Sequence, residues 1–235
     1  MILYILLIAH FLADFTLQTD QMAKRKKTEP SYLLLHCGIY AAVMTVVCCL
    51  CLEPVCGVGA GLVLALSHYL IDAIRSRFGK VGYTFHGFLA DQVLHIALIF
   101  QMSHLLGTEA VYSAILRNAM SAYPVEQILR YVLLFIVIMD PASVFVKLLT
   151  ATISTGGEEQ DPGPANVGKL IGILERLIIA FLVLADAFGS IGFVMTAKSL
   201  ARYKELNDKK FAEVYLVGTL SSIAIAIAVT YLLKP

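Results

Sequence analysis

Charged residues are scarce in this sequence, and neither sign dominates among them. Only 15% of the 235 residues are Asp, Glu, Lys or Arg, 59% are hydrophobic, and the formal net charge is +1. Such a balance gives no indication of a nucleic-acid partner, which would require a basic surface. The small charged fraction also excludes an ordinary soluble domain, in which about a quarter of the residues are charged. The composition predicts a protein that crosses the lipid bilayer several times.

The first twenty residues lack the features of a cleaved signal peptide. No basic residue precedes the apolar run, His10 and Asp14 interrupt it, and no small-residue cleavage site follows it. We therefore expect this segment to be a membrane helix of the mature protein.

The cysteines give no indication of a disulfide framework. There are five of them, an odd number, and all fall in one apolar stretch and the short loop that follows it: Cys37, Cys48, Cys49, Cys51 and Cys56. We interpret them as small lipid-facing or packing residues, and the alternative is a disulfide or thiolate site.

Apolar runs separated by short polar connections predict an all-α integral membrane protein. The expected spans are residues 2–17, 32–52, 57–74, 88–106, 169–203 and 211–233. Residues 109–123 are only moderately apolar and predict a surface helix or loop. Residues 126–152 are long enough to cross, but Pro141 predicts either one kinked span or a re-entrant pair of half-helices. The expected fold is a multi-pass helical bundle of about six spans plus a possible re-entrant segment.

Three regions follow from this order. Residues 1–107 should form a four-helix bundle, and residues 169–235 should form two C-terminal helices. Between them, residues 108–168 comprise an amphipathic segment, the Pro-broken hydrophobic segment and an acidic Gly/Pro loop at 154–168.

Basic clusters predict how the chain is inserted in the cell (inner or plasma) membrane. Lys24–Lys27 and Arg75–Lys80 should be cytoplasmic, whereas the turn at 53–57 has no Lys or Arg and should be outside. The N-terminus would then be outside. The basic segment 198–210 should also be inside, which favours a re-entrant 126–152 because strict alternation would otherwise place it outside.

Histidine and aspartate recur at one end of each of the first four expected helices. They are His10 and Asp14, His36, His68 and Asp72, and Asp91 and His95. Three of these helices carry a His–Asp pair at a spacing of four, which places both side chains on one face. In an up-and-down bundle the four ends share one depth. Since an ionisable group at that depth costs about 2.5–3.5 kcal/mol, such residues face a partner or a cavity.

We predict that these seven residues form a metal site. Mixed imidazole and carboxylate ligands suit zinc, manganese or ferrous iron, and we expect zinc or manganese. Seven ligands exceed one tetrahedral site. Either two ions lie about 3.5–4 Å apart, or some aspartates orient the histidines from outside. The same residue types also line ion and proton pathways.

Glu175 and Arg176 interrupt the apolar run after residue 169. We predict a catalytic role for both: Arg176 as a cationic group for an anionic substrate, and Glu175 as a base. The alternative is an intramembrane ion pair that ties helices together.

Several motifs resemble an uncharacterised prokaryotic membrane family, domain of unknown function 3307. They are the run from His10 to Asp20 with Met22-Ala23-Lys24, Ser67–Asp72, Asp91–His95, Gly172–Arg176 and Ala197–Arg202. The resemblance implies a multi-pass helical protein and brings no established activity. The His/Asp pattern is also loosely similar to that of membrane-bound metal-dependent hydrolases, an analogy of site type only.

The function we favour from the sequence is metal-dependent hydrolysis of a lipid-linked phosphoester at the cytoplasmic side. The expected partners are the lipid bilayer and a lipid-phosphate substrate. The alternatives are a metal-ion or proton transporter or channel, and a non-catalytic sensor or scaffold with a structural metal. Residues 41–52 and 57–66 are almost wholly apolar and offer no exit path, which disfavours transport.

Overall fold

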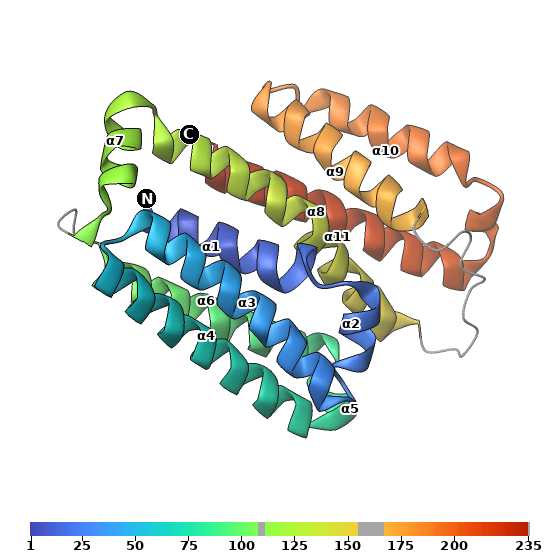
Figure 1. The fold of residues 1–235 in the computed structure, drawn as a ribbon. Helices are drawn as coiled ribbons and strands as arrows, with labels where there is room; N and C mark the ends of the chain where they lie inside the picture. The colour runs from blue at the N-terminus through green and yellow to red at the C-terminus, as the bar shows by residue number, and fades with distance from the viewer. Residues whose placement is uncertain (108–110, 155–166, 235) are drawn as a thin grey trace. The chain divides into compact units, whose positions relative to one another are not determined.

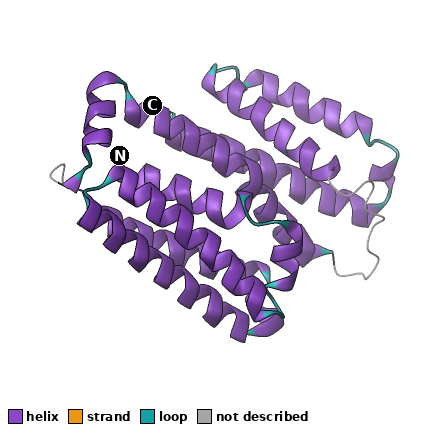
Figure 2. Cartoon of the chain, in the orientation of Figure 1, coloured by secondary structure: helices purple, strands orange, loops and turns teal. Residues whose placement is uncertain are grey.

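The computed structural model describes residues 1–107, 111–154 and 167–234. Every long element in these ranges is a helix (Figure 2). The chain divides into two compact units, Met1–Leu133 and Leu134–Pro235, each with a hydrophobic core of its own. The predicted all-α fold is confirmed.

Four helices of the first unit pack in a closed ring (Figure 1). They are α1 (Ile2–Phe11), which continues as the π-helix η1 (Leu12–Thr16), α3 (Pro30–Cys51), α4 (Pro54–Arg77) and α6 (Phe85–Leu105). α1 packs on α3 and α6, and α4 packs on the same two helices from the opposite side of the ring. The shorter helices of this unit are α2 (Asp20–Arg25), α5 (Gly79–Gly82) and α7 (Ala114–Ala122).

Local sequence signals set where these helices begin. Pro30 and Pro54 occupy the first turns of α3 and α4, where the missing N–H has no helical partner to lose. The side chains of Thr19, Thr84 and Ser113 each accept a hydrogen bond from a backbone N–H three residues on, which caps α2, α6 and α7.

Two glycines bring α3 and α4 into close contact. A Cβ atom added to Gly61 would lie 2.6 Å from Cα of Thr45, and one added to Gly57 would lie 2.8 Å from Cα of Cys49. Small residues one turn apart let helix backbones approach in a membrane environment. This contact fixes the depth of α4 against α3.

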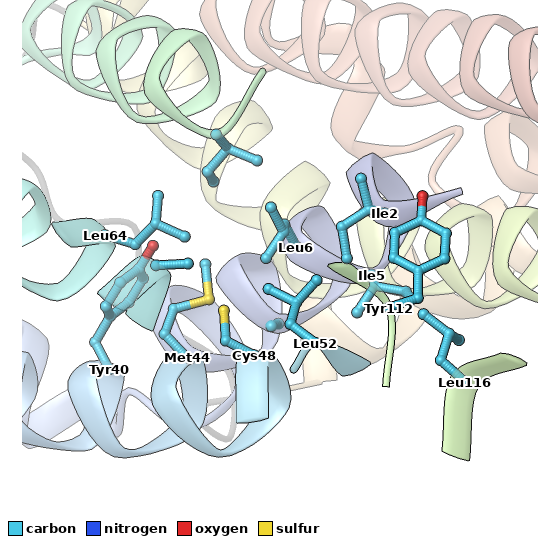
Figure 3. Packing of buried hydrophobic residues seen from close by; sticks show 14 residues of the cluster. Ile2, Ile5, Leu6, Tyr40, Met44, Cys48, Leu52, Leu64, Tyr112 and Leu116 are labelled. Atoms are coloured by element: carbon cyan, nitrogen blue, oxygen red, sulfur yellow. The ribbon is translucent and has the colours of Figure 1, made fainter. Parts of the chain in front are cut away.

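An apolar cluster fills the half of the ring that contains the N-terminus of α1 (Figure 3). Its buried side chains include Leu6, Met44, Cys48, Leu52, Leu64 and Ile99. Large apolar side chains also cover the outside of the ring, where Leu62 is 59% and Phe100 60% exposed. A bundle that is apolar both inside and outside is typical of a membrane protein.

The second unit contains the rest of the chain's helices. α8 (Val125–Ile153) begins in the first unit and enters the second, followed by α9 (Val167–Leu184), α10 (Gly189–Ala201), the short η3 (Glu205–Asn207) and α11 (Lys209–Leu233). α9 packs on α11 and α10. The core of this unit is small and includes Ile179, Val183, Ile191 and Ala226.

The predicted single helix over residues 169–203 is wrong. The helix ends at Leu184, and Asp186 adopts the left-handed conformation with φ of 56°. The N–H of Ala187 bonds back to the carbonyl of Leu182 at 2.8 Å, as at many helix ends. α10 then returns along α9, so the basic residues that follow it lie at the end where α9 begins (Figure 1).

Residues 126–152 form part of the single helix α8, with Pro141 inside it. Of the two predicted arrangements, the structure has the continuous helix and not the re-entrant pair. The reversal at Asp186 removes the reason for a re-entrant segment, because it brings the basic segment after α10 back to the starting end of α9. The predicted loop at 154–168 lies almost wholly outside the described residues.

Among the described residues, five helices are long and apolar enough to cross a membrane: α3, α4, α6, α8 and α11. The apolar helix Ile2–Thr16 is shorter than these. α9 carries Lys169, Glu175 and Arg176 within its 18 residues. The prediction of a multi-pass membrane protein thus holds on length and composition.

Candidate metal centre

The structure brings the seven predicted ligands together inside the ring of α1, α3, α4 and α6. The side chains of His10, His36 and His68 are fully buried, and none of the four others is more than 6% exposed. They come from all four helices and lie in the half of the ring that the apolar cluster does not fill. Helices that alternate in direction place these positions at one depth, which is why residues 85 positions apart can meet.

The π-helix η1 positions Asp14. Its N–H···O bonds span five residues, as between the Leu17 N–H and the Leu12 carbonyl at 2.9 Å. π-turns are rare and often occur at functional sites. Here Asp14 meets two other helices, since its Oδ1 lies 3.2 Å from Nε2 of His36 and its Oδ2 accepts from the Gln92 amide at 3.0 Å.

The first group of convergent atoms centres on His36. Its Nε2 lies 3.2 Å from both Nε2 of His68 and Oδ1 of Asp14, and 3.5 Å from Oδ2 of Asp72. A neutral imidazole has one N–H and cannot donate to several acceptors in different directions. Two ligands of one tetrahedral zinc ion, each about 2.0–2.1 Å from it, lie about 3.3 Å apart. The distances from His36 to Asp14 and to His68 match this spacing, and all three ligand atoms lie within 4.8 Å of one another.

The second group contains His95, Asp91 and Asp72, each of which offers one ligand atom within 4.8 Å of the others. The His95 Nδ1–H donates to the carbonyl of Asp91 at 2.9 Å, which leaves the lone pair on Nε2. That Nε2 and Oδ1 of Asp91 are buried and have no hydrogen-bond partner among the described residues. A histidine held by one nitrogen on a carbonyl, with the other nitrogen free, is the usual state of a metal ligand.

His10 differs from the other three histidines because both of its nitrogens are used. One tautomer satisfies the whole network: the Tyr40 hydroxyl donates to Nδ1 at 3.1 Å, and Nε2–H donates to Oε1 of Gln92 at 3.5 Å. The Gln92 amide nitrogen then donates to Asp14 and, at 3.1 Å, to Asp91. His10 and Gln92 are thus placed to orient a carboxylate of each group.

Two cations lie on the carboxylates at the loop end of the cluster. Nζ of Lys26 is 3.1 Å from Oδ2 of Asp72, and Nη1 of Arg75 donates to Oδ2 of Asp91 at 2.8 Å. Burial acts to lower the pKa of the Lys26 ammonium, but the neighbouring carboxylates of Asp72 and Asp14 raise it by more, so the net shift is upward. The Lys26 side chain therefore stays charged at neutral pH.

The sequence prediction missed four residues of this site: Lys26, Tyr40, Arg75 and Gln92. Tyr40 follows His36 by one turn, and its ring stacks on His68 with centroids 3.7 Å apart. Arg75 follows Asp72 by three residues and Gln92 precedes His95 by three, so helical spacing alone could have indicated both. Lys26 comes from the loop after α2, and only the tertiary structure brings it to Asp72.

Glu175 and Arg176 lie in the second unit and make contacts within it. Arg176 is 2% exposed and donates to the carbonyls of Ile138 and Met139 and to the hydroxyls of Ser143 and Ser222. Glu175 pairs with Lys198 of α10 at 2.6 Å. These contacts join α9 to its neighbours, as the alternative interpretation expected, and the catalytic role of the pair stays a prediction.

Comparison with known proteins gives one match. No curated protein and no solved structure matches the chain significantly. The model of the family described as "Protein of unknown function (DUF3307)" matches residues 2–121, which is more than half of the chain and includes all seven predicted ligands. The resemblance seen in the sequence motifs is confirmed, and the chain belongs to this family of proteins of unknown function.

Proposed function

We propose that this protein is a membrane-embedded, metal-dependent hydrolase of a lipid-linked phosphoester. The observation that carries the proposal is the convergence of buried histidine and aspartate atoms from four helices, in a cluster that also contains polar atoms without protein partners. Nδ1 of His36, Nδ1 of His68, Nε2 of His95 and Oδ1 of Asp91 are all buried and unbonded among the described residues. Buried polar atoms are nearly always paired, so four in one cluster call for a further partner.

A divalent zinc or manganese ion fits that need. Asp14, His36 and His68 would hold one ion, and Asp72, Asp91 and His95 supply ligands for a second or support the first. When bound, the metal supplies a Lewis acid for a phosphoryl oxygen and a water molecule of lowered pKa. Three carboxylates and two cations leave the cluster with one net negative charge if the imidazoles are neutral, and a divalent ion would make it positive.

Lys26 and Arg75 are the residues that we assign to the substrate phosphate. Both lie at the loop end of the cluster, and the Arg75 side chain is 15% exposed. A guanidinium can grip two phosphate oxygens with its fork, whereas the ammonium acts as a point charge. Each is held by a carboxylate before substrate arrives, so neither has to be ordered at the moment of binding.

The position of the site suits a lipid headgroup. Lys24, Arg25 and Lys27 are exposed in the segment that carries Lys26, so a basic rim surrounds the loop end. Such a rim attracts anionic headgroups at the membrane surface. The excess of basic residues further supports a cytoplasmic position for this end and an N-terminus outside.

Transport is the competing function, and the apolar cluster argues against it. Beyond the site, Leu6, Met44, Leu64 and Ile99 fill the ring. Conduction needs polar groups or water along the whole path, and the described part of the ring offers them only at the loop end. A sensor or scaffold would share the metal but would turn over no substrate.

The test uses purified protein reconstituted in liposomes. Lipid phosphates and prenyl pyrophosphates are supplied under several divalent metals, and released phosphate is measured. We expect metal-dependent release that is lost in His95→Ala, whereas His104→Ala, an exposed position on α6, retains it. Arg75→Gln should keep the metal but reduce turnover about 10²–10³-fold, the effect of removing one group that stabilises transition-state charge.

Three results would contradict the proposal. Protein that stays metal-free after reloading would remove its basis. Metal-loaded protein that carries ion flux and releases no phosphate would favour the transporter, and bound metal with neither activity would favour the sensor or scaffold.

Orientation has a separate test, in which single cysteines at Lys24 or Val55 are labelled in intact cells. Both positions are exposed, Val55 at 87%. An impermeant reagent should reach position 55 and not position 24. The reverse result would overturn the orientation and leave the metal site untouched.

A further inference from the structure

Cys37 is surrounded differently from the other buried cysteine. It lies on α3 directly after His36 and is 7% exposed. Its sulfur, a ring nitrogen of His68 and a carboxylate oxygen of Asp72 all lie within 4.8 Å of one another. Cys48 lies about three turns further along the same helix and packs in the apolar cluster with Met44 and Leu52. Cys37 thus lies at the edge of the His/Asp cluster and not in the apolar cluster.

His68 supplies a second observation at the same place. Its ring is fully buried, and parallel stacking on Tyr40, with an interplanar angle of 3°, holds it in position. Its Nε2 faces His36, while its Nδ1 has no hydrogen-bond partner among the described residues. A fully buried nitrogen without a partner is costly in an apolar environment. A fixed, unsatisfied ring beside a thiol and a carboxylate is therefore suited to a ligand that binds all three.

We propose that the Cys37 thiolate is a ligand of the metal centre and makes it selective for zinc over manganese or magnesium. The inference rests on the proposed function, because it concerns the same centre. A sulfur–metal bond forms as the thiol S–H bond breaks, and the proton is released to solvent. Thiolates bind soft and borderline ions such as zinc, whereas manganese and magnesium prefer oxygen. One sulfur in an imidazole and carboxylate set thus decides between the two metals that the other ligands leave open.

This assignment changes the interpretation of the cysteines. All five are free in the structure. Composition alone placed them among packing residues, and for Cys48 the apolar surroundings agree with that. Cys37 shares the helix and the residue type, but its neighbours are ligands.

The test uses the full-length protein in detergent with cobalt(II) as a spectroscopic probe for zinc. Cobalt bound by nitrogen and oxygen shows visible ligand-field bands, and a thiolate ligand adds a charge-transfer band in the near ultraviolet. We expect both in the wild type. Cys37→Ser should keep the visible bands and lose the charge-transfer band, and Cys48→Ser should keep both. In competition, Cys37→Ser should reduce the preference for zinc over manganese by at least about tenfold.

Each outcome decides the proposal. Visible bands without a charge-transfer band in the wild type would overturn the role of Cys37 and leave the metal site standing, whatever the folding of the variants. A charge-transfer band that survives in Cys37→Ser and in Cys37→Ala would assign the sulfur to another cysteine and also overturn it. Wild-type protein that binds no cobalt and no zinc would refute the metal site itself, and with it the proposed function.

Discussion

The two units bury polar side chains in opposite states. In the first unit, His36, His68 and His95 converge with nitrogens that have no protein partner. In the second, Arg176 is equally buried, but it donates to two carbonyls and two hydroxyls of α8 and α11. The same cost of burial is met within the chain at Arg176 and left partly unmet at the three histidines.

This difference separates structural from functional polar groups more reliably than burial does. A buried group whose donors are used holds helices together, and its removal should lower stability. A buried group with an unused lone pair has a place for something the chain does not supply, and its removal should abolish binding. In the sequence, both kinds of buried polar group are charged or polar residues within apolar runs. Sequence alone therefore does not distinguish the structural group from the functional one.

The largest expected effect is on metal binding. His36→Ala removes the atom on which the first group converges, so bound metal should fall to background after equilibrium dialysis and elemental analysis. Arg176→Met should retain the wild-type metal content, and so should His104→Ala as a matched histidine control. Metal retained by His36→Ala, or lost equally in Arg176→Met, would remove the distinction between the units.

The second effect is on stability. Arg176→Met keeps a similar side-chain volume but removes the Arg176 donors from the Ile138 carbonyl and the Ser222 hydroxyl, whereas the Met139 carbonyl still accepts from the Ser143 hydroxyl. Leaving buried acceptors unpaired costs about 1–3 kcal/mol each, so we expect a loss of about 3 kcal/mol in the free energy of unfolding. Thermal or denaturant unfolding in detergent measures it, with the exposed Lys204→Met as the control. A catalytic Arg176 would instead show unchanged stability and reduced turnover.

Packing gives the third comparison. Gly61→Ala would place a Cβ 2.6 Å from backbone Cα of Thr45, whereas Gly218→Ala in the second unit meets side-chain methyls alone, that of Thr150 at 3.2 Å and one of Val146 at 3.9 Å. Because a backbone cannot yield as a side chain does, Gly61→Ala should cost about 2 kcal/mol and Gly218→Ala clearly less. Gly59→Ala has open space and should stabilise α4 slightly. Equal losses at all three positions would show that the α3–α4 contact is not special.

The smallest effect is a pH dependence from Lys26. Its pKa is raised above the ordinary value of 10.5 on folding, because Asp72 and Asp14 outweigh the effect of burial. A raised lysine pKa adds stability that is present below the unfolded value and lost as pH rises through the folded value. The contribution of Lys26 to the free energy of unfolding should thus be constant from neutral pH upward and decline above about pH 10.5. The difference between wild type and Lys26→Met isolates this decline, and the exposed Lys24→Met should retain it.

Helical spacing and alternation were enough to predict the centre of the site. His68 with Asp72 and Asp91 with His95 stand four residues apart, so each pair shares a face, and alternating helices bring the faces to one depth. Lys26 could not be predicted, because its position depends on how a loop folds back over the ring. The proposed role of Cys37 could not be predicted for a related reason: its residue type fits packing, and only its neighbours suggest a ligand.

The end of α9 shows where a prediction of helix length from hydrophobic periodicity fails. Apolar residues continue through the break, so hydrophobic periodicity alone does not reveal the turn, although Asp186, Gly189 and Ser190 are residue types that favour one. The chain reverses because Asp186 takes up a left-handed conformation, which aspartate tolerates better than most residues. Its carboxylate also meets Lys234 at the end of α11 at 2.7 Å, a contact that the sequence separation conceals.

The apolar cluster in the first unit has a consequence for the rate of metal exchange. Since Leu6, Met44, Leu64 and Ile99 close the ring behind the histidines, an ion bound at the proposed site would exchange past Lys26 and Arg75. Its residence time would then follow how often the Lys26–Asp72 contact opens, rather than the strength of the ligands alone. High salt, which weakens ion pairs near the surface, should speed exchange of bound metal while leaving the equilibrium occupancy nearly constant.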